Sequence, residues 1–139
     1  MKTTIDIRFI KNIEARVYPE HMQMMQCLDD IYDLADYCEC EVDELFVLTG
    51  DNWYLIAAEH EDFVEIVDLC ADGNIGMEII KLIAVLRKRW AGKRVTMDAR
   101  ESTSYPIIRA LIRRFNYRVI RDEIWSWDDE VMHDIELQM

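Results

Sequence analysis

The chain has 139 residues, of which 51% are hydrophobic and 32% are charged, and its formal net charge is −12. This length suits one domain with a sizeable core, so we predict a single domain over residues 1–139. No apolar run is long enough to span a bilayer, and the first residues lack the apolar core of a signal peptide. The four cysteines lack a regular framework, so we expect a cytoplasmic protein with reduced thiols and no membrane partner.

The charge is unevenly distributed along the sequence. Residues 1–72 contain 18 acidic and 4 basic residues, a net charge of −14, whereas residues 73–139 contain 10 acidic and 12 basic residues, a net charge of +2. This asymmetry fits an enzyme that joins a polyanionic cofactor to a cationic acceptor, although two solvated faces would give the same pattern. The pI of about 4.6 argues against nucleic acid as a partner, and the basic stretch argues against an acidic mimic of nucleic acid.

The first part of the chain predicts one strand and one helix. Thr4–Ile10 alternates apolar and polar residues, which predicts a strand with one covered face. Pro19–Tyr37 has apolar residues at helical spacing, and its methionines belong either to the core or to an adaptable binding groove. The aspartates of this helix form either a solvated face or an attraction for an amine. Cys38 and Cys40 are one close pair of thiols, too few for a structural zinc site, so we expect no metal centre.

Three strands are predicted next, separated by two turn signals. Trp53–Ala58 is apolar on both faces, which predicts a central strand covered on both sides. Short turns between consecutive strands favour an antiparallel meander. The strands are Glu44–Gly50, Trp53–His60 and Phe63–Cys70.

Two polar features follow in the third strand and in the loop after it. Glu65 and Asp68 interrupt the apolar strand, and such carboxylates must face either solvent or a functional cleft. The loop Ala71–Met77 contains two glycines and precedes a helix with an apolar stripe that ends near Trp90. A helix start of this kind is typical of an anion site, although a plain turn and helix cap would look the same.

The last part of the chain predicts a strand, a helix and two further strands. Lys93–Asp98 alternates, and Pro106 stands in the first turn of a helix that leaves through Asn116, a residue suited to a left-handed turn. Tyr117–Trp127 and Val131–Met139 then resume extended patterns. His133 falls on the apolar face of the last strand, where a hydrogen-bonded sheet histidine is more common than a ligand or base.

This order of elements resembles the GNAT superfamily of acyl-CoA-dependent N-acyltransferases from Trp53 to Trp127. Leu111 meets the family motif N-x-x-A-x-x-L-Y-x-x-x-G-F, with Asn116 at its glycine position and Tyr117 at its phenylalanine position. Gly76 meets the end of the loop motif Q/R-x-x-G-x-G/A. The departures are Tyr105 in place of the asparagine, Ile112 in place of the tyrosine acid, Ala71 in place of the basic residue and Asn74 in place of the first glycine.

The resemblance implies an α/β fold with a mixed, mostly antiparallel sheet of about seven strands and helices on both faces. It implies acetyl-CoA as the co-substrate, with its pantetheine arm paired like an added strand where Phe63–Cys70 and Lys93–Asp98 splay apart. The cofactor-binding residues would then lie at the end of the first strand and in the following loop. They are Leu69, Cys70, Ala71, Gly73, Asn74, Ile75, Gly76 and Met77.

The resemblance also implies transfer of the acetyl group to a primary amine, on a small molecule or a lysine-like side chain. The amine attacks only when neutral, so a carboxylate must take its proton, and Glu65 and Asp68 are the candidates by position. For the acid that assists the leaving thiolate we predict Tyr105, because Ile112 cannot serve. The motif departures favour the alternative of a GNAT-shaped binding or structural protein without catalysis. Trp125 and Trp127 belong either to the core or to an exposed pair that contacts a partner chain, and the resemblance implies a homodimer through this edge.

Overall fold

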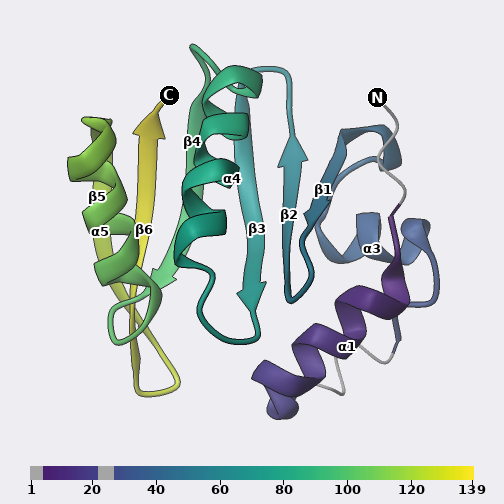
Figure 1. Ribbon diagram of the computed structural model, residues 1–139. Helices are drawn as coiled ribbons and strands as arrows, with labels where there is room; N and C mark the ends of the chain where they lie inside the picture. Colours follow the sequence, from purple (N-terminus) through teal and green to yellow (C-terminus); the bar gives the residue numbers. More distant parts are fainter. Residues whose placement is uncertain (1–4, 22–26) are drawn as a thin grey trace. The chain divides into compact units, whose positions relative to one another are not determined.

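The computed structural model describes residues 5–21 and 27–139 (Figure 1). The chain divides into two compact units. Unit 1 comprises Met1–Glu59 and Val67–Lys81. Unit 2 comprises His60–Ile66 and Leu82–Met139. The boundaries fall inside one strand and one helix, so these two elements contribute residues to both units.

The described residues form six strands, one fewer than predicted, in the sheet order β1-β2-β3-β4-β6-β5. The strands are β1 (Leu45–Thr49), β2 (Trp53–Glu59), β3 (Phe63–Ala71), β4 (Arg94–Arg100), β5 (Arg118–Trp127) and β6 (Glu130–Gln138). The helices are α1 (Ile7–Val17), α3 (Ile31–Tyr37), α4 (Gly76–Arg89) and α5 (Ser104–Phe115), with short 3-10 turns at Pro19–His21 and Val42–Glu44. The predicted mixed, mostly antiparallel α/β architecture is therefore confirmed.

Unit 1 is built on the apolar strand β2. Its residues from Trp53 to Ala58 are all buried, as the two-sided apolar pattern predicted. β1 pairs with β2 in antiparallel register, from Leu45 opposite Ala58 to Thr49 opposite Tyr54. The core of this unit joins α1 and α3 to these strands and to the end of β3. Its buried members are Ile10, Ile13, Leu28, Leu34, Cys38, Val47, Tyr54, Ile56 and Cys70.

The strand predicted at Thr4–Ile10 is wrong, because helix α1 begins at Ile7; Thr4 itself lies outside the described residues. The side chain of Asp6 accepts a hydrogen bond from the backbone N–H of Phe9 at 3.1 Å, which caps the helix start. The residues buried along α1 are Ile10, Ile13 and Glu14, a helical spacing. The alternation of the first apolar residues is thus overridden by the helical period that follows it.

The helix predicted over Pro19–Tyr37 is confirmed over Ile31–Tyr37, which is α3, whereas Pro19–His21 is a 3-10 turn. The Asp30 side chain accepts from the N–H of Asp33 at 2.9 Å and caps α3. Asp30 has an extended backbone, so α3 begins anew at Ile31. The methionines that the prediction placed in a core or a groove, Met22, Met24 and Met25, lie outside the described residues.

Unit 2 packs α5 against strands β4, β6 and β5. Its core contains Ala99, Ile112, Ile135 and Leu137, flanked by half-buried apolar side chains from the same elements. Helix α5 ends as predicted at Asn116, which has a left-handed backbone with φ of 54°. β5 and β6 form an antiparallel hairpin whose two-residue turn, Asp128-Asp129, also has positive φ angles of 50° and 63°.

The parallel ladder between β3 and β4 is short. It consists of three residue pairs, from Phe63 opposite Arg94 to Glu65 opposite Thr96. β3 nevertheless continues to Ala71 and β4 continues to Arg100. The sequence predicted two parallel strands that do not pair along their whole length, and this register agrees with that prediction.

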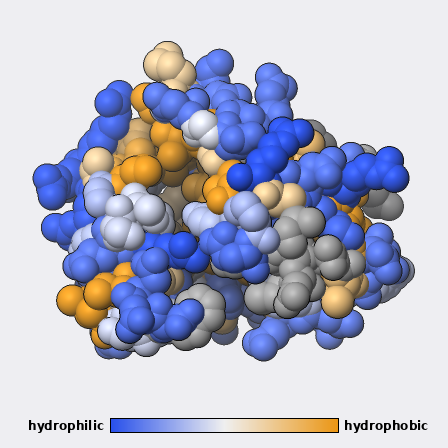
Figure 2. All heavy atoms as spheres, turned by 90° about the horizontal axis from the view of Figure 1, so that it is seen from below, coloured by the Kyte–Doolittle hydropathy of each residue, from blue (hydrophilic) through white to orange (hydrophobic). Residues whose placement is uncertain are grey.

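The face of the molecule drawn in Figure 2 is mostly hydrophilic, with its apolar side chains in separate groups. Exposed apolar side chains include Tyr32, Met77 and Ile124, which come from different elements. No helix among the described residues has the length and apolar character needed to cross a membrane.

Candidate active site

The hydroxyl group of Tyr54 meets two carboxylates inside unit 1. Tyr54 lies on β2 and is fully buried, and its hydroxyl is 2.6 Å from Oδ2 of Asp68 on β3. The same hydroxyl contacts Oε2 of Glu14 on α1, a residue that is 4% exposed. Cys70, which is also buried, lies two residues after Asp68 on β3. We call Glu14, Tyr54, Asp68 and Cys70 the Tyr54 cluster.

The Tyr54 cluster has one hydroxyl proton between two carboxylates. A phenol has one proton to donate, so Tyr54 satisfies only one of the two carboxylates at a time. Burial, the negative charge of Asp68 and the hydrogen bonds to Asp68 and Glu14 raise the pKa of Tyr54, so the phenol keeps its proton. Two carboxylates around one hydroxyl are suited to accepting a further proton, which is what a general base must do.

Burial and the charges of the same two carboxylates also raise the pKa of two further side chains, Cys70 and Tyr37. Burial, followed by the charges of Glu14 and Asp68, raises the pKa of the Cys70 thiol, which therefore stays neutral and is not a nucleophile. Burial and the charges of Asp68 and Glu14 also raise the pKa of Tyr37. Because Tyr37 is 40% exposed, the influence of the carboxylates reaches a side chain that solvent can contact.

Glu14 and Tyr54 are members of the site that the sequence did not single out. Glu14 follows Ile13 on the buried face of α1, so a carboxylate at an apolar position of the helical period was the available signal. That signal was hidden because the region was expected to begin with a strand. Tyr54 was expected to be core, and its hydroxyl is the polar part that needed a buried partner.

Glu65, the other predicted base, lies apart from this cluster in the strand pattern. Side chains alternate along a strand, and Glu65 and Asp68 are three positions apart, so they point to opposite faces of β3. Glu65 is exposed. Of the two predicted bases, the Tyr54 cluster contains Asp68, and Glu65 stays a prediction without a described partner group.

The predicted cofactor residues span the end of β3, the following loop and the start of α4. Leu69, Cys70 and Ala71 end β3, Gly73, Asn74 and Ile75 lie in the loop, and Gly76 and Met77 begin α4. Gly73 has a φ of 101°, which glycine adopts without strain, and α4 begins at Gly76. The Asn74 side chain accepts a hydrogen bond from the N–H of Gly76 at 2.8 Å. The loop is fixed to Asn52 through the N–H and the carbonyl of Asp72, with distances of 2.8 and 2.6 Å.

The loop fits the pyrophosphate of acetyl-CoA in its backbone and only in part in its side chains. A helix start at Gly76, approached through a left-handed glycine, presents N–H groups and the positive end of the helix dipole. The N–H of Gly76 is occupied by Asn74, however, and a pyrophosphate would have to displace that side chain. The Asp72 carboxylate is paired with Arg16 at 3.6 Å, which reduces its repulsion of an anion.

Tyr105, the predicted acid, belongs to a second cluster, in unit 2. Its hydroxyl donates to Oδ2 of Asp122, and its ring stacks on the His133 ring with a centroid distance of 3.5 Å. Nδ1 of His133 is 2.8 Å from Oδ1 of Asp122, and Nε2 is 3.5 Å from Oε1 of Glu101. His133 is 4% exposed, so it is a hydrogen-bonded sheet histidine, as the sequence predicted.

The electrostatics of this second cluster do not favour proton donation by Tyr105. The hydrogen bond to Asp122, with burial and the Asp122 charge, raises the pKa of Tyr105. Burial works to raise the pKa of Asp122, but the hydrogen bonds from Tyr105 and His133 outweigh burial and hold it below its ordinary value. A tyrosine that donates to an ionised carboxylate is a weaker acid, and its role toward a thiolate stays a prediction.

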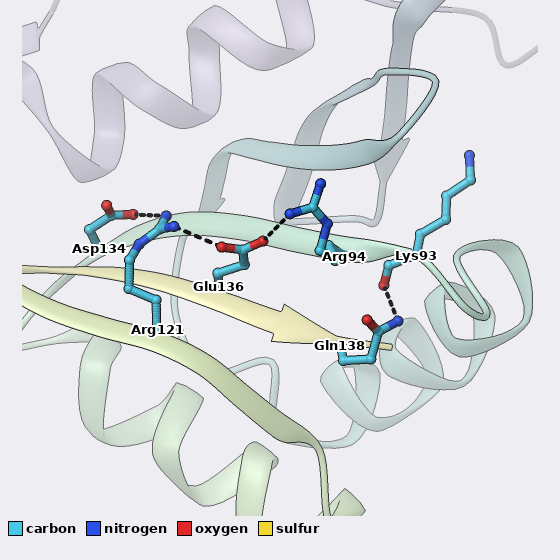
Figure 3. Close-up of polar contacts among 6 residues, drawn as sticks. All are labelled: Lys93, Arg94, Arg121, Asp134, Glu136 and Gln138. Atoms are coloured by element: carbon cyan, nitrogen blue, oxygen red, sulfur yellow. Dashed lines mark hydrogen bonds and ion pairs between the residues drawn. The ribbon is translucent and has the colours of Figure 1, made fainter.

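A third polar group lies on the sheet of unit 2 (Figure 3). Glu136 on β6 accepts hydrogen bonds from Nη1 of Arg94 at 3.1 Å and from Nη1 of Arg121 at 2.7 Å. Arg121 also donates to Oδ1 of Asp134 at 3.1 Å. We call these four residues the sheet network; it contains two cations and two anions in alternation, so its charges are matched.

Three solved structures similar to the chain over nearly its full length are acyltransferases. The ribosomal-protein-S18-alanine N-acetyltransferase of Escherichia coli has a TM-score of 0.59 and 16% identity, covering 99% of this chain and 90% of that protein. An acyl-CoA N-acyltransferase of Pseudomonas aeruginosa has a TM-score of 0.55 and 13% identity, with 95% and 92% covered. An acetyltransferase of Bacillus cereus has a TM-score of 0.50 and 13% identity, with 100% and 96% covered.

These similarities establish the fold of the chain and do not establish its substrate. No protein-family model matches the sequence. No curated protein matches it either. Identities of 13–16% show a shared architecture without showing a shared substrate. The chain has the fold of the GNAT N-acetyltransferases, as the order of its motifs predicted.

Proposed function

We propose that the protein transfers an acetyl group from acetyl-CoA to a primary amine. The observation that carries the proposal is the Tyr54 cluster, found in a chain with an N-acetyltransferase fold. Asp68, the base predicted from the sequence, shares the Tyr54 hydroxyl with the buried carboxylate of Glu14. Titratable side chains that lie close together and perturb one another's pKa, as in this cluster, are found more often at functional sites than elsewhere.

In this proposal the side chains of unit 1 manage the acceptor and its proton. Acetyl-CoA would supply the acetyl group, activated as a thioester. Asp68 takes the proton that the amine must lose to form an amide, and Tyr54 and Glu14 hold Asp68 in position and share the added proton. The proton finally leaves with the released thiol, so the carboxylates are regenerated. The N–H groups at the start of α4 would hold the pyrophosphate.

The charge of unit 1 supports a cationic acceptor. By sequence it contains 16 acidic and 5 basic residues, a net charge of −11, against 12 acidic and 11 basic residues in unit 2, a net charge of −1. An excess of one sign raises the local concentration of the opposite ion and speeds its arrival. We therefore propose a small amine or a lysine-like side chain as the acceptor. Separately, the free thiols of Cys27, Cys38, Cys40 and Cys70 support the cytoplasm as the place of reaction.

Acetyl-CoA binding and turnover test this proposal separately. Acetyl-CoA should raise the melting temperature in proportion to the logarithm of its concentration above the Kd. Thiol release should then be measured over polyamines, amino acids and lysine peptides. Gly76→Glu should weaken binding at least tenfold more than Gly76→Gln, because the two side chains match in size and differ in charge. Equal effects of these variants would remove the loop from the cofactor site.

The alternative is a GNAT-shaped binding or structural protein without catalysis. The hydrogen bond from the N–H of Gly76 to Asn74 favours it, because the loop already satisfies a donor that a pyrophosphate needs. A flat melting temperature up to millimolar acetyl-CoA would support this alternative and exclude the transferase.

A further inference from the structure

A pocket of about 400 Å³ lies in unit 2, where α5 ends and β5 begins. This volume falls in the range of pockets that hold small molecules. The residues that matter below come from the last turn of α4, the end of α5, the start of β5 and the end of β6. They are Arg87, Phe115, Asn116, Tyr117, Arg118 and Gln138. We call it the α5–β5 pocket.

Two guanidinium groups line this pocket, and no acidic side chain is among its lining residues, which also include Ala91 and Met139 with its terminal carboxylate. Neither Arg87 nor Arg118 forms an ion pair within the part of the chain that the structure describes. The sequence explains why: residues 79–97 and residues 102–121 contain no acidic residue. Arg94 and Arg121, by contrast, are both paired with carboxylates of the sheet network (Figure 3).

Arg87 is positioned by two aromatic rings. Its guanidinium carbon is 5.5 Å from the centre of the Phe115 ring and 6.0 Å from that of Tyr117. The two rings are 6.0 Å apart and inclined by 34°. Cation–π contacts restrain the guanidinium but leave its N–H donors available, so this arginine can still bind an anion.

The hydroxyl of Tyr117 lacks the partner that a buried polar group normally has. It is buried and makes no hydrogen bond with any described residue. Burial raises the pKa of Tyr117, while the charge of Arg87 opposes the shift, so the hydroxyl remains a neutral donor. Buried hydroxyl groups are nearly always hydrogen-bonded. Because this oxygen has almost no accessible surface, a ligand in the pocket would reach it only after a rotation of the Tyr117 ring or of its neighbours.

Helix-dipole compensation alone does not account for this arrangement. Basic residues are common in the last turn of a helix because they offset its negative end, and Arg87 is in that position. Compensation explains neither the pocket nor the unpaired Tyr117 hydroxyl. Arg118 lies at the start of β5, opposite Gln138 in the register and three residues after the end of α5, so both arginines lie close in sequence to a helix C-terminus.

We propose that the α5–β5 pocket binds a small organic phosphate, with its phosphate on Arg87 and Arg118 and its organic part against Phe115 and Tyr117. Two arginines match the double negative charge of a phosphate monoester better than the single charge of a carboxylate, and each can bind two oxygens. The side-chain amides of Asn116 and Gln138 and the Tyr117 hydroxyl would serve the polar atoms of the ligand.

Calorimetric titration of the full chain with AMP, ribose 5-phosphate and inorganic phosphate tests this assignment without relying on enzyme activity. We expect the two esters to bind more tightly than inorganic phosphate, and salt to weaken binding. Arg118→Gln and Arg87→Gln should each lower affinity at least tenfold. Arg113→Gln, an exposed residue outside the pocket with the same change of charge, should leave affinity within about twofold.

Two further variants separate this pocket from the proposed cofactor loop. Gly76→Glu should leave binding of the esters unchanged, because Gly76 begins helix α4 and Arg87 lies in the last turn of the same helix. Tyr117→Phe should weaken binding and raise the melting temperature of the free protein, since it removes a buried hydroxyl without a partner. Equal affinity of Arg118→Gln and Arg113→Gln, loss of binding in Gly76→Glu, or no binding of any probe at millimolar concentration would overturn the proposal.

Discussion

Two polar groups of the molecule, the Tyr54 cluster in unit 1 and the sheet network in unit 2, use charge in opposite ways. The sheet network alternates two arginines with two carboxylates, and each carboxylate has a cationic partner. The Tyr54 cluster brings two carboxylates to one neutral phenol, beside a neutral thiol. Matched charges stabilise a surface, whereas carboxylates held close together retain the capacity to bind a proton. The second arrangement is therefore the candidate for chemistry.

The largest effect that we predict is the loss of turnover when a carboxylate of the Tyr54 cluster is removed. Asp68→Asn keeps the shape and an acceptor for Tyr54 but removes the base, so we expect kcat to fall by about 10² to 10⁴. Glu65→Gln is the matched control, because Glu65 is exposed and points to the other face of β3. Thiol release with acetyl-CoA and the best amine measures both variants. Similar losses in the two variants would move the base away from the Tyr54 cluster.

The sheet network should respond in stability and not in turnover. Glu136→Gln removes the carboxylate shared by Arg94 and Arg121, and we expect the melting temperature to fall by roughly 5 °C. Asp134→Asn is the milder comparison, because that carboxylate is 38% exposed and has one arginine partner. Thermal unfolding followed by circular dichroism measures both. A large loss of kcat in Glu136→Gln at unchanged stability would contradict the structural role.

The smallest effect is expected at Tyr105. Tyr105→Phe removes one donor that holds the Asp122 pKa down, and should cost about 0.5 kcal/mol at neutral pH. A lowered folded-state pKa stabilises the fold above the ordinary value of about 3.9, and that stabilisation is lost as the pH falls through the folded-state value. The difference between wild type and Tyr105→Phe should therefore shrink toward about pH 3.

Urea unfolding at several pH values measures that difference, and the same variant tests the predicted acid. Because its pKa is raised, Tyr105 is a weak proton donor, and we expect kcat of Tyr105→Phe to fall by less than about tenfold. A larger loss would restore Tyr105 to the role of acid, and a stability difference that grows in acid would contradict the account of Asp122.

The sequence predicted most strands and failed where two periodicities overlap. The strands from Leu45 onward follow from alternation and turn signals, and the end of α5 follows from Asn116. The segment before Ile10 alternates like a strand, but the Asp6 cap and the helical spacing of Ile13 and Glu14 dominate. Packing outweighs the local alternation in this segment, since a helix buries Ile10 on the same face as Ile13.

Of the two carboxylates in the Tyr54 cluster, the sequence predicted only the one that stands out from the pattern of its own strand. Asp68 stood out because a carboxylate in an apolar strand needs a reason. Its partners Tyr54 and Glu14 are 14 and 54 residues away along the chain, and only the fold brings them together. The α5–β5 pocket could not be predicted from the sequence. The lack of acidic residues around Arg87 and Arg118 is visible there, but only the structure shows that the two arginines line one pocket.

The Asp128-Asp129 turn has a consequence for the order in which the chain folds. Two consecutive left-handed residues reverse the chain tightly and match the natural twist of paired strands, so the β5–β6 ladder can grow outward from its tip. All of its pairings are close in sequence, and local contacts form fastest. We expect this hairpin to nucleate the C-terminal region, and Asp129→Gly to accelerate refolding in stopped-flow experiments while barely changing the unfolding rate.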